Sequence, residues 1–319
     1  MTVPIHSPGT SETQGGAARA ASGATPAMPP FRPGGRIDER DQPIWYRIAK
    51  RVLGYGVLVI FALMFITPFA LALANSLKSR AETAAAPLAL IPSEPTLRAY
   101  ELMAQTDIPR WTLNSIVVTV MVTLGRLFLC SLAGYALARL EFPGRAVVFA
   151  IVVGVLAVPA IVLAIPRYLI LGQLGLLDTY GGLILPLAVD AFGIFLMKTF
   201  FESVPREMEE AARIDGASIF QTYWRIILPL AAPGLIALTI LSFQGSWNEF
   251  LHPLIAAPSD PDLRTLPVGL ALLRGAQGES LDFPLLLGAS LLITVPVAII
   301  FFTFQRYFIQ GVAASGVKG

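Results

Sequence analysis

The sequence is short of the residue types that build most metal and thiol sites. Only Cys130 is a cysteine, and only His6 and His252 are histidines, in a chain of 319 residues. A single cysteine excludes an intramolecular disulfide and a thiolate metal cluster, and two distant histidines do not suggest a metal centre. No serine–histidine–aspartate or paired-carboxylate arrangement stands out either. We therefore expect neither a metal site nor catalytic residues, and the chain is not predicted to be an enzyme.

Charge is scarce as well. Charged residues make up 14% of the chain, against about 25% in ordinary soluble domains. The formal net charge of +2 gives no indication of a nucleic-acid partner, because the basic residues are dispersed and form no patch, and we expect none. None of the lysines follows a glycine, so the sequence has no P-loop for ATP. We expect no cofactor on this chain.

What the sequence has in abundance is apolar residues, at 55% of the chain. They gather in runs of about 20 residues, the length that crosses a bilayer as a helix. The expected spans are residues 52–74, 115–137, 146–165, 182–200, 230–250 and 285–308. We predict an all-α polytopic membrane protein with six transmembrane helices in a lipid bilayer.

The flanking segments complete the predicted domain organisation. Residues 1–43 are rich in small residues and proline, and we expect a disordered cytoplasmic tail. Residues 44–319 form the predicted membrane domain, with outer loops at 75–112 and 252–284 and a cytoplasmic tail at 310–319. Lysine and arginine near the span ends are more frequent on the side of the N-terminus, so we expect both termini in the cytoplasm.

A charged stretch, residues 203–229, interrupts the apolar second half of the chain, and we call it the elbow. Ser203 is the candidate N-cap and Pro205 suits a first helical turn. Gly216 is a helix stop, and Ser218 with Gln221 forms a capping box for a second helix that ends at 228. The elbow is therefore predicted to be a helix-turn-helix between two spans. Apolar stripes are expected along both helices, and that of the first consists of Met208, Ala211, Ala212 and Ile214.

The spacing within the elbow resembles a known motif. It is similar to the EAA loop of ABC-importer permease subunits. The matching pattern is Glu210-Ala211-Ala212, then three residues, Gly216, nine residues, Ile226, one residue and Leu228-Pro229. The resemblance implies a type I permease fold and a coupling loop that docks on an ATPase. It assigns this role to Glu210, Ala211, Ala212, Asp215, Gly216, Ile226, Leu228 and Pro229. Two alternatives are an amphipathic helix on the lipid surface and a solvated loop.

Other stretches extend the resemblance to residues 44–319. Six stretches are similar to the carbohydrate-uptake branch of ABC-importer permeases, and to six-span permeases of the maltose-transporter type. They are residues 75–78, 114–115, 133–145, 245–250, 265–270 and 305–311. The resemblance implies a bacterial inner-membrane location, a second, non-identical permease, two ATP-binding subunits carrying ATP and magnesium, and an extracytoplasmic solute-binding protein. Gly316 and Lys318 lie in a terminal segment similar to a tail that contacts the ATPase.

Polar side chains within the spans are candidates for a translocation path, because such groups are costly at membrane depth. They are Asp190, Gln244, Asn248 and Glu249, with Trp247 as an aromatic surface for a sugar. Alternatively, Asp190 pairs within the chain and Glu249 reaches the outer interface. Arg126 is expected to pair with an acid or with a partner subunit. An ion-coupled secondary transporter and a non-transporting scaffold are the other classes considered.

Overall fold

The computed structural model describes residues 43–277 and 282–316, and in these ranges it contains helices and no strand. The all-α prediction is confirmed. Predictions for the tail at 1–42 and for Lys318 lie outside the described residues. The chain divides into two compact units, residues 1–60 and 61–319. In the first unit, the described residues form the N-terminal part of helix α1 (Ile44–Ser76), whose apolar side chains are exposed.

Three helices of the described chain are long and apolar enough to cross a membrane: α1, α4 (Ile108–Arg139) and α15 (Phe283–Gly316). Three bent pairs of segments also qualify. They are Arg145–Leu156 with Ala160–Gln173, Tyr180–Leu187 with Ala191–Ser203, and Ile219–Leu230 with Ala232–Trp247. The structure thus accommodates up to six spans if each bent pair is one span. Because α15 continues to Gly316, residues 310–316 of the predicted tail are helical.

The third predicted span, residues 146–165, is not one continuous helix. Helix α5 (Arg145–Leu156) stops before Pro159, and the chain resumes with a 3₁₀ turn (Ala160–Leu163) and α6 (Ala164–Gln173). The two halves are bent by 102°. Proline lacks an N–H donor and disfavours helical geometry in the residue before it, which explains the break at Pro159.

The two segments predicted as outer loops contain short helices. The first holds α2 (Arg80–Ala85) and α3 (Arg98–Gln105), and the second holds α13 (Leu251–Ala256) and α14 (Leu266–Gln277). Buried Lys78 organises the first segment, because its Nζ donates to Asn75 Oδ1 at 3.0 Å and to the carbonyls of Ala86 and Ala89 at 2.9 and 2.6 Å. These bonds satisfy an ammonium group that burial would otherwise penalise.

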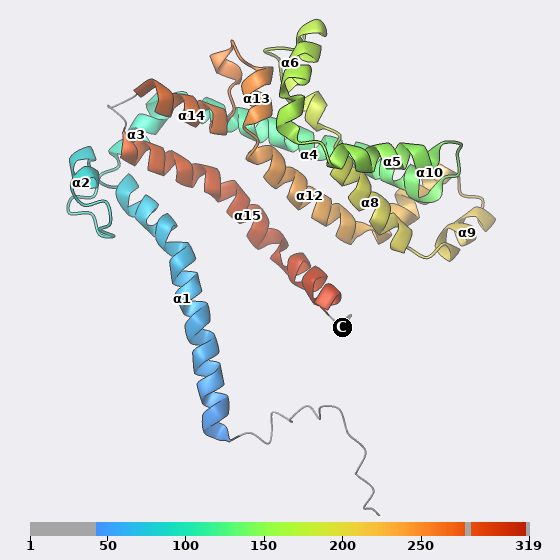
Figure 1. The fold of residues 1–319 in the computed structure, drawn as a ribbon, viewed down its shortest axis with the longest axis horizontal. Helices are drawn as coiled ribbons and strands as arrows, with labels where there is room; N and C mark the ends of the chain where they lie inside the picture. The colour runs from blue at the N-terminus through green and yellow to red at the C-terminus, as the bar shows by residue number, and fades with distance from the viewer. Residues whose placement is uncertain (1–42, 278–281, 317–319) are drawn as a thin grey trace, which may run out of the picture. The chain divides into compact units, whose positions relative to one another are not determined.

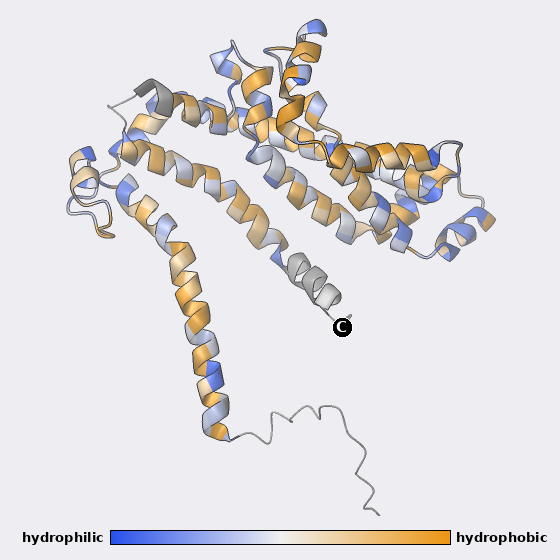
Figure 2. Ribbon diagram, viewed as in Figure 1, coloured by the Kyte–Doolittle hydropathy of each residue, from blue (hydrophilic) through white to orange (hydrophobic). Residues whose placement is uncertain are grey.

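Helix α4 is the centre of the second unit and packs along α8 (Ala191–Ser203) and α12 (Ala232–Trp247) (Figure 1). Gly134 allows α4 to approach α8 closely, since a Cβ at Gly134 would lie 2.7 Å from the Cβ of Met197. Small residues serve this purpose where membrane helices meet. The adjoining buried cluster includes Tyr135, Phe201 and Tyr223. Figure 2 shows α9 (Glu207–Ile214) as largely hydrophilic, in contrast to the hydrophobic helices α5 and α12.

Candidate functional site

The elbow begins later than its sequence suggests. Ser203 is the last residue of α8, and its hydroxyl donates to the carbonyl of Phe200 at 2.7 Å. The prediction that Ser203 caps the next helix is therefore wrong. Val204 is extended, and α9 starts at Glu207 after an N-cap residue, Arg206, that makes no side-chain cap. The physical reason is that the apolar packing of α8 continues through Phe201, which is fully buried.

The turn in the elbow agrees with its prediction. Gly216 has a φ of +80°, a conformation that glycine adopts without a steric penalty. Its N–H donates to Arg213 O at 3.0 Å, and the N–H of Ala217 donates to Ala212 O at 2.9 Å. This pair of bonds is a Schellman motif, which satisfies carbonyls at the end of α9. Asp215, at the C-cap, is exposed.

The capping box is confirmed, but the second elbow helix is not uniform. The Gln221 N–H donates to Ser218 Oγ at 3.2 Å, and the Ser218 N–H donates to Gln221 Oε1 at 2.8 Å. After α10 (Ile219–Thr222) the chain forms a π-helical turn (Tyr223–Ile227) and then α11 (Leu228–Leu230). The π turn places Tyr223 in the core, where its hydroxyl lies 2.7 Å from Ser131 Oγ of α4.

The face of α9 that packs inward differs from the predicted apolar stripe. Glu209 and Ala212 are buried, with 5% and 4% exposure, whereas Met208, Ala211 and Ile214 are exposed. Of the four residues in the predicted apolar stripe, only Ala212 packs inward. An acid can occupy the inward face because an arginine of α4 lies opposite it.

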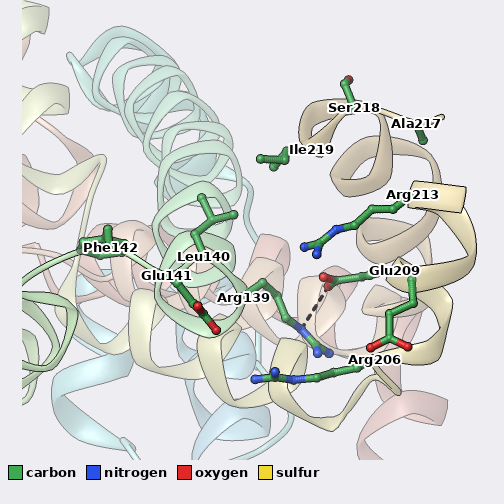
Figure 3. Close-up of a pocket in the computed structure, with 11 residues that line it drawn as sticks. Arg139, Leu140, Glu141, Phe142, Arg206, Glu209, Arg213, Ala217, Ser218 and Ile219 are labelled. Carbon is green, nitrogen blue, oxygen red and sulfur yellow. Dashed lines mark ion pairs between the residues drawn. The ribbon is translucent and has the colours of Figure 1, made fainter.

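That arginine is Arg139, at the end of α4. Its Nε lies 3.2 Å from Glu209 Oε1, an ion pair marked by the dashed line in Figure 3. The two side chains are 3% and 7% exposed. Arg139 Nη2 also donates to the carbonyls of Phe201 and Val204, at the junction of α8 and the elbow. Sequence reasoning missed Glu209 because the neighbouring Glu210 fits the motif. The available signal was the three-residue spacing of Glu209 and Ala212, which puts both on one helical face.

A groove of about 740 Å³ opens between α9 and the turn after α4. Figure 3 shows charged side chains of both signs around it, and Glu210 is an exposed member of its lining. The charged lining residues are Arg139, Glu141, Arg206, Glu209, Glu210 and Arg213. Such a groove suits a polar protein partner, because both signs of charge can be matched across an interface.

The remaining motif residues divide between packing and exposure. Ile226 and Leu228 are half-buried and pack against the cluster that contains Tyr223. Pro229 is exposed in the first turn of α11. The structure therefore places Glu210, Ala211 and Asp215 on the open side of the elbow. It buries Ala212, and it packs Ile226 and Leu228 against the cluster that contains residues of α4, α8 and α12.

Among the candidate path residues, Asp190 lies at the break before α8. Its Oδ1 accepts the Gly193 N–H at 2.5 Å as the N-cap of α8, and its Oδ2 lies 2.9 Å from Nη1 of Arg126. The Nε of Arg126 donates to Leu187 O at 2.8 Å. The expectation that Arg126 pairs with an acid is confirmed. The pair remains partly open, with 29% exposure of Asp190.

The other path candidates lie at the end of α12. Gln244 and Asn248 are exposed, and Gln244 lines a hollow of about 60 Å³ between α12 and α15. Glu249 accepts the backbone N–H of His252 at 3.0 Å. Trp247 differs from the expectation: it is 2% exposed, stacks on Phe243, and donates its Nε1–H to Ile293 O. Because it fills the core between α12 and α15, it offers no open aromatic surface, and we correct its role to packing.

In the part of the chain that the structure describes, no group of three or more histidine, cysteine, aspartate or glutamate side chains could hold a metal ion. Comparison with known proteins then decides the family. Residues 130–314 match the binding-protein-dependent transport system inner membrane component family. The chain belongs to this family. It is a permease subunit of an ABC importer, an integral inner-membrane protein and not an enzyme, as the sequence resemblance implied.

Individual relatives cover most of this permease. The sulfoquinovosyl glycerol transport permease of Agrobacterium fabrum is 37% identical over 250 residues, covering 77% of this chain and 86% of its own. The trehalose/maltose transport permease of Thermococcus litoralis is 32% identical over 277 residues, with 85% and 98% covered. A chain of a bacterial ABC transporter that imports the acidic polysaccharide alginate has a TM-score of 0.73 at 27% identity, with 84% and 99% covered. Family membership excludes the secondary transporter and the scaffold as readings of this chain.

Proposed function

We propose that this permease is one of two non-identical membrane subunits of an importer for a sugar or sugar derivative. Two ATP-binding subunits carry ATP and magnesium, and an extracytoplasmic protein delivers the cargo. The relatives above, whose names refer to sulfoquinovosyl glycerol, trehalose/maltose and alginate, support a carbohydrate cargo. Both termini and the elbow lie in the cytoplasm, a placement supported by the excess of basic residues near those span ends.

The observation that carries the proposal is the outer face of the elbow. Glu210 is exposed beside the groove, and exposed apolar side chains accompany it: Met208, Ile214, Ile219, Phe220 and Trp224. Ile214 is 86% exposed. A rigid amphipathic helix with such a face fits a groove on a protein partner. We assign this face to the cleft of an ATP-binding subunit, with Glu210 through Gly216 at its centre.

The same assignment gives roles to the predicted residues. Glu210, Ala211 and Asp215 contact the ATP-binding subunit, whereas Ala212, Gly216, Ile226, Leu228 and Pro229 set the shape of the elbow. Gly316 and Lys318 form a second contact with that subunit. Asp190, Gln244, Asn248 and Glu249 are the path residues, with hydrogen-bonding groups suited to sugar hydroxyls. ATP-driven movement of the elbow opens the path alternately to each side of the membrane.

Purification of the tagged permease from its native membrane in mild detergent tests the assembly. We expect a P-loop ATPase and a second permease to co-purify. Recovery of the permease alone, under conditions that preserve related transporters, would overturn the proposal.

Transport of labelled oligosaccharides in cells tests the role of the elbow. Glu210→Ala should abolish uptake while the protein still inserts in the membrane. Glu207→Ala is the matched control, since Glu207 is an exposed acid on the same helix outside the motif. Equal uptake by the two variants would contradict docking through Glu210.

A further inference from the structure

Helix α4 carries two arginines that hold opposite ends of α8. Arg126 binds both sides of the break before α8, through the Asp190 carboxylate and the carbonyl of Leu187. Arg139 binds the carbonyls of Phe201 and Val204 at the other end. A guanidinium group can do this because it presents several donors in a fixed plane. Helix α8 is therefore tied to α4 at its beginning and at its end.

Packing between the two ties leaves little freedom for α8 to slide. A Cβ at Gly125 would lie 2.8 Å from the Cβ of Ala188, and one at Gly134 would lie 2.7 Å from the Cβ of Met197. The backbone of α4 thus approaches the α8 segment closely at both levels. Closely packed helices move together, because a shift of one would require the interlocked side chains of the other to leave their positions.

Arg139 also connects α4 to the elbow, through its ion pair with Glu209. Both side chains of this ion pair are almost fully buried, and separating a buried pair leaves a charge without compensation. The adjacent Glu210 has no such constraint, because it is exposed. When α9 moves, Glu209 is expected to remain with Arg139, so that α4 follows.

We propose that Arg139 and Glu209 are positioning residues that transmit movement of the elbow into α4, and that Arg126 transmits it to the break at Asp190. This inference rests on the proposed docking of the elbow on an ATP-binding subunit. The far end of the connection is Asp190, which is itself a path candidate, and it lies close to α12, since a Cβ at Gly245 would lie 3.8 Å from Arg126 Nη1. Helices α4, α8 and α9 then move as one rigid unit, which transmits movement driven by ATP hydrolysis to the translocation path.

The first test measures cargo moved per ATP hydrolysed by the complete transporter in proteoliposomes. Glu209→Gln should retain the ATP-binding subunits and ATP hydrolysis, but lower this ratio by about five-fold or more, the lower range of measured couplings between sites. Glu210→Gln is the matched control and should instead weaken retention of the ATP-binding subunits. Glu209→Asp keeps the charge and should give an intermediate ratio.

The second test measures how rigidly α9 is connected to α4 by pulsed electron paramagnetic resonance. Spin labels are placed at Met121 of α4 and Glu207 of α9, two exposed positions, in a Cys130→Ala background. The distance distribution should be narrow in the labelled parent and in Glu210→Gln, and broad in Glu209→Gln. A merely stabilising role of Glu209 would lower the yield of complex without changing cargo per ATP.

An unchanged ratio and an unchanged distance distribution in Glu209→Gln would overturn the inference. If Glu209→Gln does not assemble with the ATP-binding subunits, Glu209→Asp is measured instead. An unchanged ratio of cargo moved to ATP hydrolysed in Glu209→Asp would also overturn the inference. Failure of the docking proposal is recognised separately, because the unsubstituted permease would then be recovered without an ATP-binding subunit.

Discussion

Arg126 of α4 and Asp190 at the start of α8 form an ion pair with 2.9 Å between Nη1 and Oδ2. The same carboxylate caps α8 by accepting the Gly193 N–H. One side chain therefore has two separable functions, which are neutralising Arg126 and completing the helix end. Together they stabilise a break in a segment that runs through the apolar part of the protein.

The double role of Asp190 leads to a first prediction. Asp190→Asn removes the charge but keeps an oxygen that can cap α8, whereas Asp190→Ala removes both. We expect Asp190→Ala to be the less stable by about 0.5–2 kcal/mol, the usual contribution of an N-cap. Thermal unfolding of the detergent-purified complex measures the difference. Equal stability of the two variants would show that the cap contributes nothing.

A second prediction concerns the contact of α4 with α8. Gly134→Ala should destabilise the complex, because the new Cβ would lie 2.9 Å from the backbone nitrogen of Lys198 as well as near Met197. Gly154→Ala is the control within α5, since a Cβ there meets nothing within 4 Å. Alanine favours a helix over glycine by about 1 kcal/mol, so the control should be neutral or stabilising. The yield of intact complex after mild heating distinguishes the two, and an equal loss in both variants would argue against close packing at Gly134.

The turn of the elbow gives a third prediction. Gly216→Ala places a Cβ at a φ of +80°, where an L-residue is penalised by about 1–2 kcal/mol. Gly216→Asn should be tolerated better, because asparagine enters this region more readily. We expect Gly216→Ala to lower the amount of ATP-binding subunit recovered with the permease and Gly216→Asn to retain most of it. Equal recovery with both would mean that docking does not depend on the left-handed turn.

A fourth prediction follows from His252 of α13. Its Nε2 lies 2.9 Å from the carbonyl of Gly182, which can only accept, so Nε2 carries the hydrogen. Burial lowers the pKa of His252 below its ordinary value of 6.5, and the hydrogen bond to Gly182 offsets this only in part. In the described chain Nδ1 has no hydrogen-bond partner for a second proton.

The sign of the pH effect follows from the lowered pKa. The unfolded chain takes up the His252 proton near pH 6.5, before the folded chain does, so folding is disfavoured as the pH falls below about 6.5. We expect the melting temperature of the complex to decrease between about pH 7.5 and about pH 5.5, and His252→Gln to weaken this dependence. The same slope in parent and variant would exclude His252 as its source.

The sequence by itself determined the local features of this permease. The Gly216 turn and the Ser218–Gln221 capping box depend on residues within one or two turns of each other. The spacing of these residues in the sequence was therefore sufficient to predict both features. The apolar runs likewise predicted the long helices, because the hydrophobic length of a bilayer sets the length of a span. The break at Pro159 was also encoded locally, although its angle of 102° was not.

Only the tertiary structure decided which polar side chain faces which neighbour. Glu209 and Glu210 are adjacent and chemically identical, yet Glu209 is buried against Arg139 while Glu210 is exposed. Trp247 was expected at a path and instead fills the core. These outcomes depend on how α4, α8, α12 and α15 pack, which brings together residues far apart in the sequence. Burial then fixes the partners, because a charge or an N–H group removed from water must be compensated within the protein.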